Sequence, residues 1–125
     1  MTHTQKILIV DDDIISSLVT GKNLEKRGFA NTKIVKTGTE ALEIIAEFNP
    51  DVVLMDMRLA GELDGVQTTL IIRKVSQVPV IFFSATVDQN EIDRAKAIAN
   101  TRFFDRFTLF DTVVETILQM TPPKV

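Results

Sequence analysis

The chain of 125 residues has no cysteine, no tryptophan and no tyrosine, and His3 is its single histidine. Without cysteine there is no disulfide and no thiolate metal site. The lone histidine lies in a polar N-terminal stretch, whereas a catalytic triad or a histidine-ligated metal needs histidine in a shaped pocket. These absences favour a cytoplasmic location and a site built from oxygen-bearing side chains.

The sequence also lacks a long hydrophobic run, and the stretch from Met1 to Lys6 is too polar for a signal peptide. We therefore expect no membrane association. A net charge of −3 at neutral pH disfavours direct nucleic-acid binding, because phosphate backbones bind basic faces. A chain of this length fits one domain over residues 1–125, with the Pro-rich segment 121–125 as a tail or the start of a linker.

Short apolar runs alternate with amphipathic helical patterns along the whole chain. The expected strands are Lys6–Val10, Thr32–Lys36, Val52–Met55, Val78–Phe83 and Arg102–Phe104. Five helices are expected between and after these strands. Their expected buried residues are, helix by helix in chain order, Ile14, Leu18, Gly21 and Leu24; Ala41, Leu42, Ile45 and Phe48; Val66, Leu70 and Ile71; Ile92, Ala95 and Ile98 or Ala99; and Phe110, Val113, Val114, Ile117 and Leu118. This alternation predicts an α/β fold: a doubly wound, five-stranded parallel sheet of order 2-1-3-4-5 with helices on both faces, as in flavodoxin-like proteins.

Acidic residues follow two of these strands. The first strand runs into Asp11, Asp12 and Asp13, and the third ends at Asp56. Asp13 suits the role of helix cap, but a turn needs no more than one of these carboxylates. If the first and third strands are neighbours, Asp11 and Asp12 converge on Asp56 at one sheet edge. The crowded like charges should raise at least one pKa. Oxygen-only ligands of this kind suit Mg²⁺, whereas a solvated acidic loop is the simpler alternative.

Two further strand ends add other groups to the same edge. Ser84 follows the fourth strand and brings a hydroxyl, and Arg106 follows the fifth and brings a permanent cation. An acceptor carboxylate, a metal, a hydroxyl and a cation are the parts that phosphoryl transfer uses, since catalysis there is mostly positioning and charge neutralisation. Asp56, Ser84 and Arg106 are therefore the candidate reactive set.

Together these segments resemble those of a known family. The chain is similar over essentially its whole length to the receiver domain of two-component response regulators. The matching segments are Ile7–Asp13, Pro50–Gly65, Val78–Ile81 with Ser84-Ala85, and the aromatic Phe103. The resemblance implies that Asp56 accepts a phosphoryl group from a histidine kinase or a histidine phosphotransfer protein. It implies a signalling phosphoacceptor that catalyses only its own phosphorylation and dephosphorylation.

The resemblance also implies the ligands of a Mg²⁺ ion. Asp12 and Asp56 would bind it directly, together with the main-chain carbonyl of Arg58, and Asp11 would act through water.

Other residues receive switching roles from the same resemblance. Ser84 would bind a phosphoryl oxygen, and Phe103 would change rotamer as Ser84 moves. Arg58 and Thr86 occupy positions that tune the hydrolysis of the aspartyl phosphate. A downstream protein would bind the face formed by the helix at about 88–99, the following strand and the last helix.

The sequence departs from the family at Arg106-Phe107, where the family has lysine followed by proline. Arginine is planar and forked, so it could bind Asp56 or Asp11 in a bidentate pair. A cis bond before Phe107 would cost about 3–4 kcal/mol, so we expect a trans bond. This departure leaves open a pseudo-receiver, an interaction module that switches weakly or not at all. An aspartyl-phosphate phosphatase that uses the acidic residues after the first strand is a further alternative, but it leaves Asp56 without a role.

Overall fold

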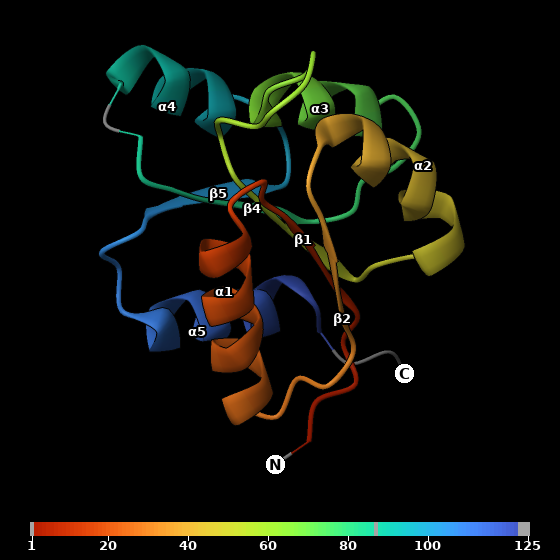
Figure 1. Ribbon diagram of the computed structural model, residues 1–125, viewed down its shortest axis with the longest axis vertical. Helices are drawn as coiled ribbons and strands as arrows, with labels where there is room; N and C mark the ends of the chain where they lie inside the picture. Colours follow the sequence, from red (N-terminus) through yellow and green to blue (C-terminus); the bar gives the residue numbers. More distant parts are fainter. Residues whose placement is uncertain (1, 87, 123–125) are drawn as a thin grey trace.

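The computed structural model describes residues 2–86 and 88–122 (Figure 1). Its single sheet is parallel and has the strand order β2-β1-β3-β4-β5, so the predicted topology is confirmed. The elements are β1 (Ile7–Val10), α1 (Ile14–Lys26), β2 (Thr32–Val35), α2 (Gly38–Phe48), β3 (Val52–Met55), α3 (Gly65–Ile72), β4 (Val80–Ser84), α4 (Gln89–Lys96), β5 (Thr101–Asp105) and α5 (Phe110–Met120).

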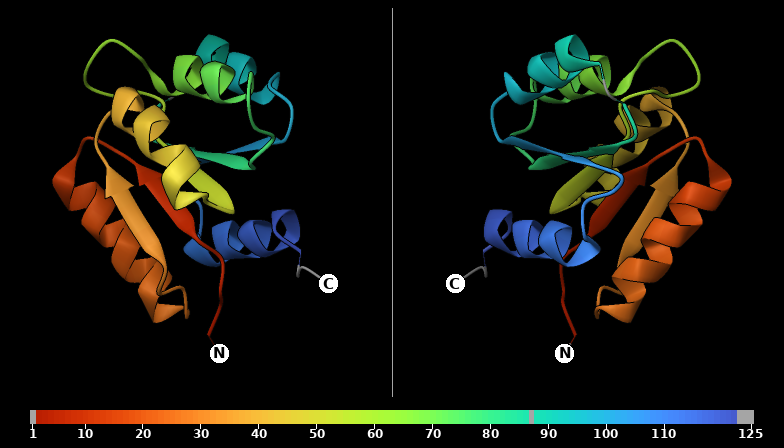
Figure 2. Two further views of the ribbon diagram at one scale, coloured as in Figure 1. Left: turned by 90° about the vertical axis from the view of Figure 1, so that its right-hand side faces the viewer. Right: turned by 90° about the vertical axis from the view of Figure 1, so that its left-hand side faces the viewer.

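The helices cover the sheet on both faces (Figure 2). On one face, Leu24 of α1 and Ile117 of α5 pack in a core cluster with strand residues such as Ile9. On the other face, α2, α3 and α4 contribute Ala41, Val66, Ile72 and Ala95 to a second cluster. Within the described ranges, no helix has the length and apolarity to cross a bilayer. Residues 123–125 of the expected tail lie outside the described residues.

The inward faces expected for three helices are partly wrong. In α1, Ile14 and Leu18 are 57% and 55% exposed, and in α3, Leu70 and Ile71 are 48% and 37% exposed. Leu118 of α5 is 36% exposed. The buried positions include hydroxyl residues instead, namely Ser17, Thr20, Thr68, Thr69 and Thr116.

The hydroxyl groups of these buried residues can be satisfied within their own helices. Ser17 Oγ donates to the carbonyl of Ile14 at 3.0 Å, and Thr69 Oγ1 donates to that of Gly65 at 2.8 Å. A serine or threonine that bonds back to the preceding turn buries no unpaired polar atom, so it can face the core. A pattern of apolar residues alone therefore misses the buried hydroxyl residues and includes some exposed positions of these helices.

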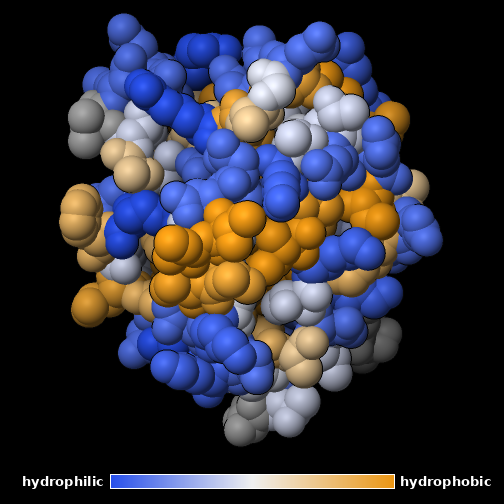
Figure 3. All heavy atoms as spheres, in the orientation of Figure 1, coloured by the Kyte–Doolittle hydropathy of each residue, from blue (hydrophilic) through white to orange (hydrophobic). Residues whose placement is uncertain are grey.

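The outward turn of α1 leaves an apolar surface, the α1 face, made of Ile14, Ile15, Leu18 and Val19. Figure 3 shows apolar side chains gathered over α1 and also near the β5–α5 connection. In that connection, Phe107 is 92% exposed. The bond before Phe107 is trans, as predicted, since the described residues contain no cis peptide bond.

Local contacts fix where β3 ends and the loop before α3 begins. The Asp56 N–H donates to the carbonyl of Val10 at 3.0 Å, which ties the ends of β1 and β3 together. Gly65 opens α3 directly beside this point, and a Cβ there would lie 2.1 Å from the Asp56 carbonyl oxygen. Only glycine allows this close approach, so Gly65 sets the position of Asp56.

Candidate functional site

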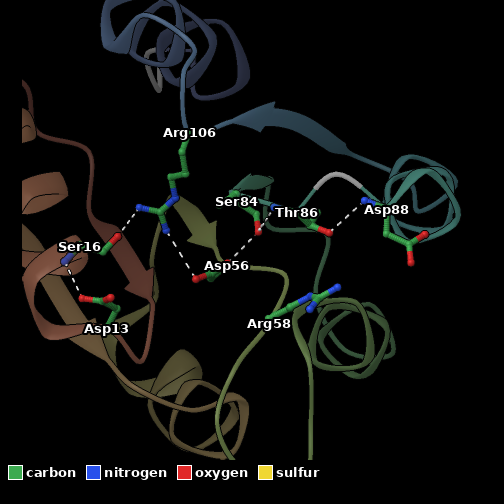
Figure 4. A pocket seen from close by; sticks show the side chains of 9 residues that line it. Asp13, Ser16, Asp56, Arg58, Ser84, Thr86, Asp88 and Arg106 are labelled. Carbon is green, nitrogen blue, oxygen red and sulfur yellow. Dashed lines mark hydrogen bonds and ion pairs between the residues drawn. The ribbon is translucent and has the colours of Figure 1, made fainter.

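A cleft of about 790 Å³ opens at the carboxyl ends of the strands (Figure 4). It is lined by Asp13, Ser16, Asp56, Arg58, Ser84, Ala85, Thr86, Asp88 and Arg106. The parallel register explains the meeting of these distant residues, since Val10 pairs with Met55 and Ser84 with Asp105. The predicted site residues from three different strand ends therefore face one cavity.

Asp11, Asp12 and Asp56 form the acidic cluster that the sequence predicted. One carboxylate oxygen from each lies within 4.8 Å of the others. Asp11 is only 2% exposed, and both of its oxygens are engaged: Oδ1 accepts the Asp13 N–H at 3.0 Å and Oδ2 accepts from Arg106 at 3.0 Å. Asp12 is exposed. The donor set is entirely oxygen and fits Mg²⁺. The assignment of Asp12 and Asp56 to direct ligation, and of Asp11 to a contact through water, stays a prediction.

Asp56 has a different partner at each carboxylate oxygen. Its Oδ1 accepts the Ser84 hydroxyl at 2.8 Å, and its Oδ2 lies 3.6 Å from Nη2 of Arg106. Burial raises the pKa of the Asp56 carboxyl, and the neighbouring Asp11 adds to the rise, whereas the Ser84 hydrogen bond and Arg106 oppose it. The expected rise of one pKa in the cluster is confirmed, but its largest cause is burial and not repulsion between like charges.

Each of the three guanidinium nitrogens of Arg106 has a partner. Its Nε donates to the Phe83 carbonyl at 2.9 Å, Nη1 donates to Ser16 Oγ, and Nη2 bridges Asp11 and Asp56. The guanidinium carbon lies 4.6 Å from the centre of the Phe83 ring. The expected bidentate pair is therefore wrong, because a single nitrogen serves both carboxylates while the other two nitrogens bind elsewhere.

The opposite side of the cleft carries Arg58 and Thr86. The Thr86 hydroxyl donates to Glu91 Oε2 at 2.8 Å, and Arg58 Nη2 lies 3.7 Å from the same oxygen. Glu91 on α4 thus joins the two residues that the resemblance linked to hydrolysis. Ser84 Oγ also accepts the Thr86 N–H at 3.4 Å, which connects this side to Asp56.

Residues 7–106 match the response regulator receiver domain. The chain belongs to this family. It is 34% identical over 91 residues to the DNA-binding response regulator MtrA of Mycobacterium tuberculosis, a match that covers 73% of this chain and 39% of MtrA. The matched segment thus spans well under half the length of this curated relative.

Solved receiver domains share the fold. The N-terminal domain of a response regulator/sensory box/GGDEF protein from Carboxydothermus hydrogenoformans is 30% identical with a TM-score of 0.78, covering 94% of this chain and 93% of that one. The receiver domain of sensor histidine kinase PA1611 from Pseudomonas aeruginosa, solved with a magnesium ion in its active-site cleft, has a TM-score of 0.83 at 24% identity. That match covers 95% of this chain and 98% of the other. This receiver domain carries an acidic cluster at the carboxyl edge of its sheet.

Three residues that contact the predicted set were missed by the sequence reasoning. Ser16 and Phe83 hold Arg106, and Glu91 joins Arg58 to Thr86. Nothing in the local sequence distinguishes them, because their role comes from the packing of α1, β4 and α4 around the strand ends. Phe103 does not line the cleft: it is half-buried and packs against the core on the α2–α4 side. Its rotamer switching stays a prediction.

Proposed function

We propose that this receiver domain accepts a phosphoryl group on Asp56 from a phosphohistidine, carried by a histidine kinase or a histidine phosphotransfer protein. The observation that supports this most is the pairing of the Asp56 carboxylate with a hydroxyl on one oxygen and a guanidinium near the other. A donor and a cation so placed match the charge that spreads over the equatorial phosphoryl oxygens during transfer.

The chain's own groups divide the transfer between them. A carboxylate oxygen of Asp56 forms the new bond to phosphorus, while the bond from phosphorus to the donor's imidazole nitrogen breaks and its electron pair returns to the ring. Ser84 and Arg106 then exchange contacts with the carboxylate for contacts with phosphoryl oxygens. Arg106 also keeps its bond to Asp11, so it need not move far.

The acidic cluster supports a requirement for Mg²⁺. Asp12, Asp56 and the main-chain carbonyl of Arg58 would hold the ion directly, and Asp11 would hold it through water. When bound, the ion neutralises the negative charge that gathers where carboxylates and a phosphoryl group meet. Because Asp11 already has two protein partners, we expect Asp12→Ala to weaken Mg²⁺ binding more than Asp11→Ala does.

Incubation with acetyl phosphate and Mg²⁺, followed by intact mass measurement, tests the proposal. The expected result is one added phosphoryl group that is lost in Asp56→Asn and absent when Mg²⁺ is chelated. Asp64→Asn is a matched control, because Asp64 is also an aspartate of the β3–α3 connection but only caps the N-terminus of α3. Labelling that persists in Asp56→Asn, or acid-stable phosphate on Ser84, would sink the proposal.

The surface around the cleft supports a phosphodonor protein as partner. The exposed α1 face lies on one side of the opening, and Phe107 and Leu109 in the β5–α5 connection are 92% and 77% exposed. Apolar side chains of this size at a cleft edge are typical of protein-binding surfaces. We propose that the donor docks there and that a downstream protein binds the α4–β5–α5 face. MtrA is a DNA-binding regulator, but we propose no direct DNA contact for residues 1–125.

The second candidate function is a pseudo-receiver that binds partners without switching. The replacement of the family's lysine by Arg106 favours it, because Arg106 already has a full set of partners before any phosphate arrives. Beryllofluoride, a phosphoryl mimic, separates the two candidates. Amide shifts that move around Ser84, Phe103 and α4 support a switching receiver, and binding without such movement supports the pseudo-receiver.

A further inference from the structure

We propose that Phe83 and Ser16 are positioning residues that fix the guanidinium of Arg106 beside Asp56. The inference rests on the proposed function, because it assigns the groups that make an arginine able to act where the family has lysine. It goes beyond that function because these two side chains touch neither Asp56 nor a metal ligand in any interaction described above.

The need for positioning follows from the arginine side chain. Arginine has as many freely rotating side-chain bonds as lysine, but its head is wider and planar with nitrogens on three sides, so an unsupported guanidinium can present different nitrogens from many positions around an acidic cleft. Arg106 keeps 22% of its side chain exposed, and its Nη2 lies 3.0 Å from Asp11 but 3.6 Å from Asp56. A guanidinium that followed the closer carboxylate alone would be free to rotate away from Asp56.

Ser16 and Phe83 remove that freedom from two directions. The Ser16 hydroxyl on α1 accepts a hydrogen bond from Nη1, and the Phe83 ring lies 4.6 Å from the guanidinium carbon. A cation over an aromatic face is attracted to it, and more strongly where water is excluded. Phe83 is 8% exposed and is itself held by Phe110, whose ring is 6.1 Å away in a T-shaped contact. With these contacts made, and with Nε donating to the Phe83 backbone carbonyl, Nη2 is the nitrogen that remains for the carboxylates.

The test compares variants by their rate of labelling with acetyl phosphate and Mg²⁺. Phe83→Leu removes the aromatic face but leaves the backbone carbonyl of residue 83, which still accepts from Nε. Phe29→Leu is the matched control, because Phe29 is 1% exposed in the same core cluster and stacks on His3 instead. We expect Phe83→Leu to slow labelling about fivefold to tenfold, the range of a partly buried cation–π contact, and Phe29→Leu to slow it less than about twofold.

Ser16→Ala and an Arg106→Lys background complete the set. We expect Ser16→Ala to slow labelling about threefold, the usual scale of one hydrogen bond. In the Arg106→Lys background both changes should have less than about a twofold effect, since lysine lacks the planar fork that makes these contacts. A purely structural role predicts the same loss in both backgrounds and an equal loss in Phe29→Leu, and either result overturns the proposal.

A measurement without phosphate keeps this claim separate from the proposed function. Nitrogen-edited NMR of the Arg106 side chain should show an Nε–H signal that is protected from exchange, shifted in Phe83→Leu and broadened in Ser16→Ala. If the unmodified protein takes up no phosphate, the proposed function is wrong and these signals decide the positioning role. An Nε–H signal that is unchanged in both variants overturns the positioning role, and a shift in Phe83→Leu with broadening in Ser16→Ala supports that role.

Discussion

Arg106 and Arg58 face the same cleft from opposite sides (Figure 4), with 22% and 73% of their side chains exposed. Arg106 has partners on all of its nitrogens and a ring against its guanidinium. Arg58 has an ion pair with Glu91 at 3.7 Å. The two sides of the cleft therefore hold the same type of charge in different ways.

Under the proposed function, this difference distinguishes an arginine that would act in the transfer from one that would adjust its rate. A charge fixed in a partly buried site stabilises developing negative charge without first having to be oriented. An exposed charge is screened by salt and loses entropy whenever it is ordered. We therefore place Arg106 in the transfer step and expect Arg58 to change rates only modestly.

The largest expected effect comes from removing each charge in turn. Arg106→Met should slow labelling of Asp56 by about 100-fold, the typical cost of one fixed donor to a developing oxyanion. Arg58→Met should slow it by less than about threefold, because an exposed pair contributes little. Both variants are measured with acetyl phosphate at saturating Mg²⁺. Equal effects in the two variants would remove the distinction between the two sides.

A second effect, up to a similar size in free energy, is expected from ligand binding. Millimolar Mg²⁺ should raise the melting temperature at neutral pH, because an ion that binds only the folded state stabilises it by about 2.7 kcal/mol at a hundredfold excess over its Kd. Asp12→Ala should lose most of this rise. A melting temperature indifferent to Mg²⁺ would contradict a metal site at the acidic cluster.

The raised pKa of Asp56 gives a prediction about pH. An aspartate with a higher pKa in the folded state than the ordinary 3.8 binds protons more tightly when folded, so stability falls as pH rises from 3.8 through the raised value. Asp56→Asn should abolish this fall and stabilise the metal-free protein at neutral pH, because the amide carries no charge that burial penalises. Urea unfolding from acid to neutral pH measures both effects. A steeper fall in Asp56→Asn would contradict the assignment.

The smallest effect should come from the side of the cleft that carries the exposed Arg58. Glu91→Gln weakens the contacts that join Arg58 to Thr86, and we expect it to change the lifetime of phosphorylated Asp56 by up to about threefold. Asp93→Asn on the same helix is the control, because Asp93 bonds to Gln89 and does not line the cleft. A change larger than that of Arg106→Met would reverse the roles of the two sides.

Sequence reasoning located the strands and their ends because buried parallel strands leave continuous apolar runs and because register alone brings Asp11, Asp56 and Ser84 to one edge. It placed the inward face of α1 only in part: Leu24 is buried as expected, but Ser17 was missed because its hydroxyl is satisfied within the helix. It also missed Ser16, because a serine on a helix has no signature of the arginine that reaches it from the end of β5. Contacts between side chains of distant elements depend on rotamers that no local pattern encodes.

Arg106 and Asp11 are 95 positions apart in the sequence, and Arg106 and Ser16 are 90 apart. The contact between the segments that follow β1 and β5 therefore closes a very long loop, and non-local pairings of this kind are slow to form in folding. During synthesis, Asp56 emerges from the ribosome well before its cation does. Under the proposed function, a partly folded chain without a docked β5 would have the acceptor carboxylate but would lack the cation beside it. Competence for labelling should thus return after helical structure during refolding, so that labelling would report that β5 has docked.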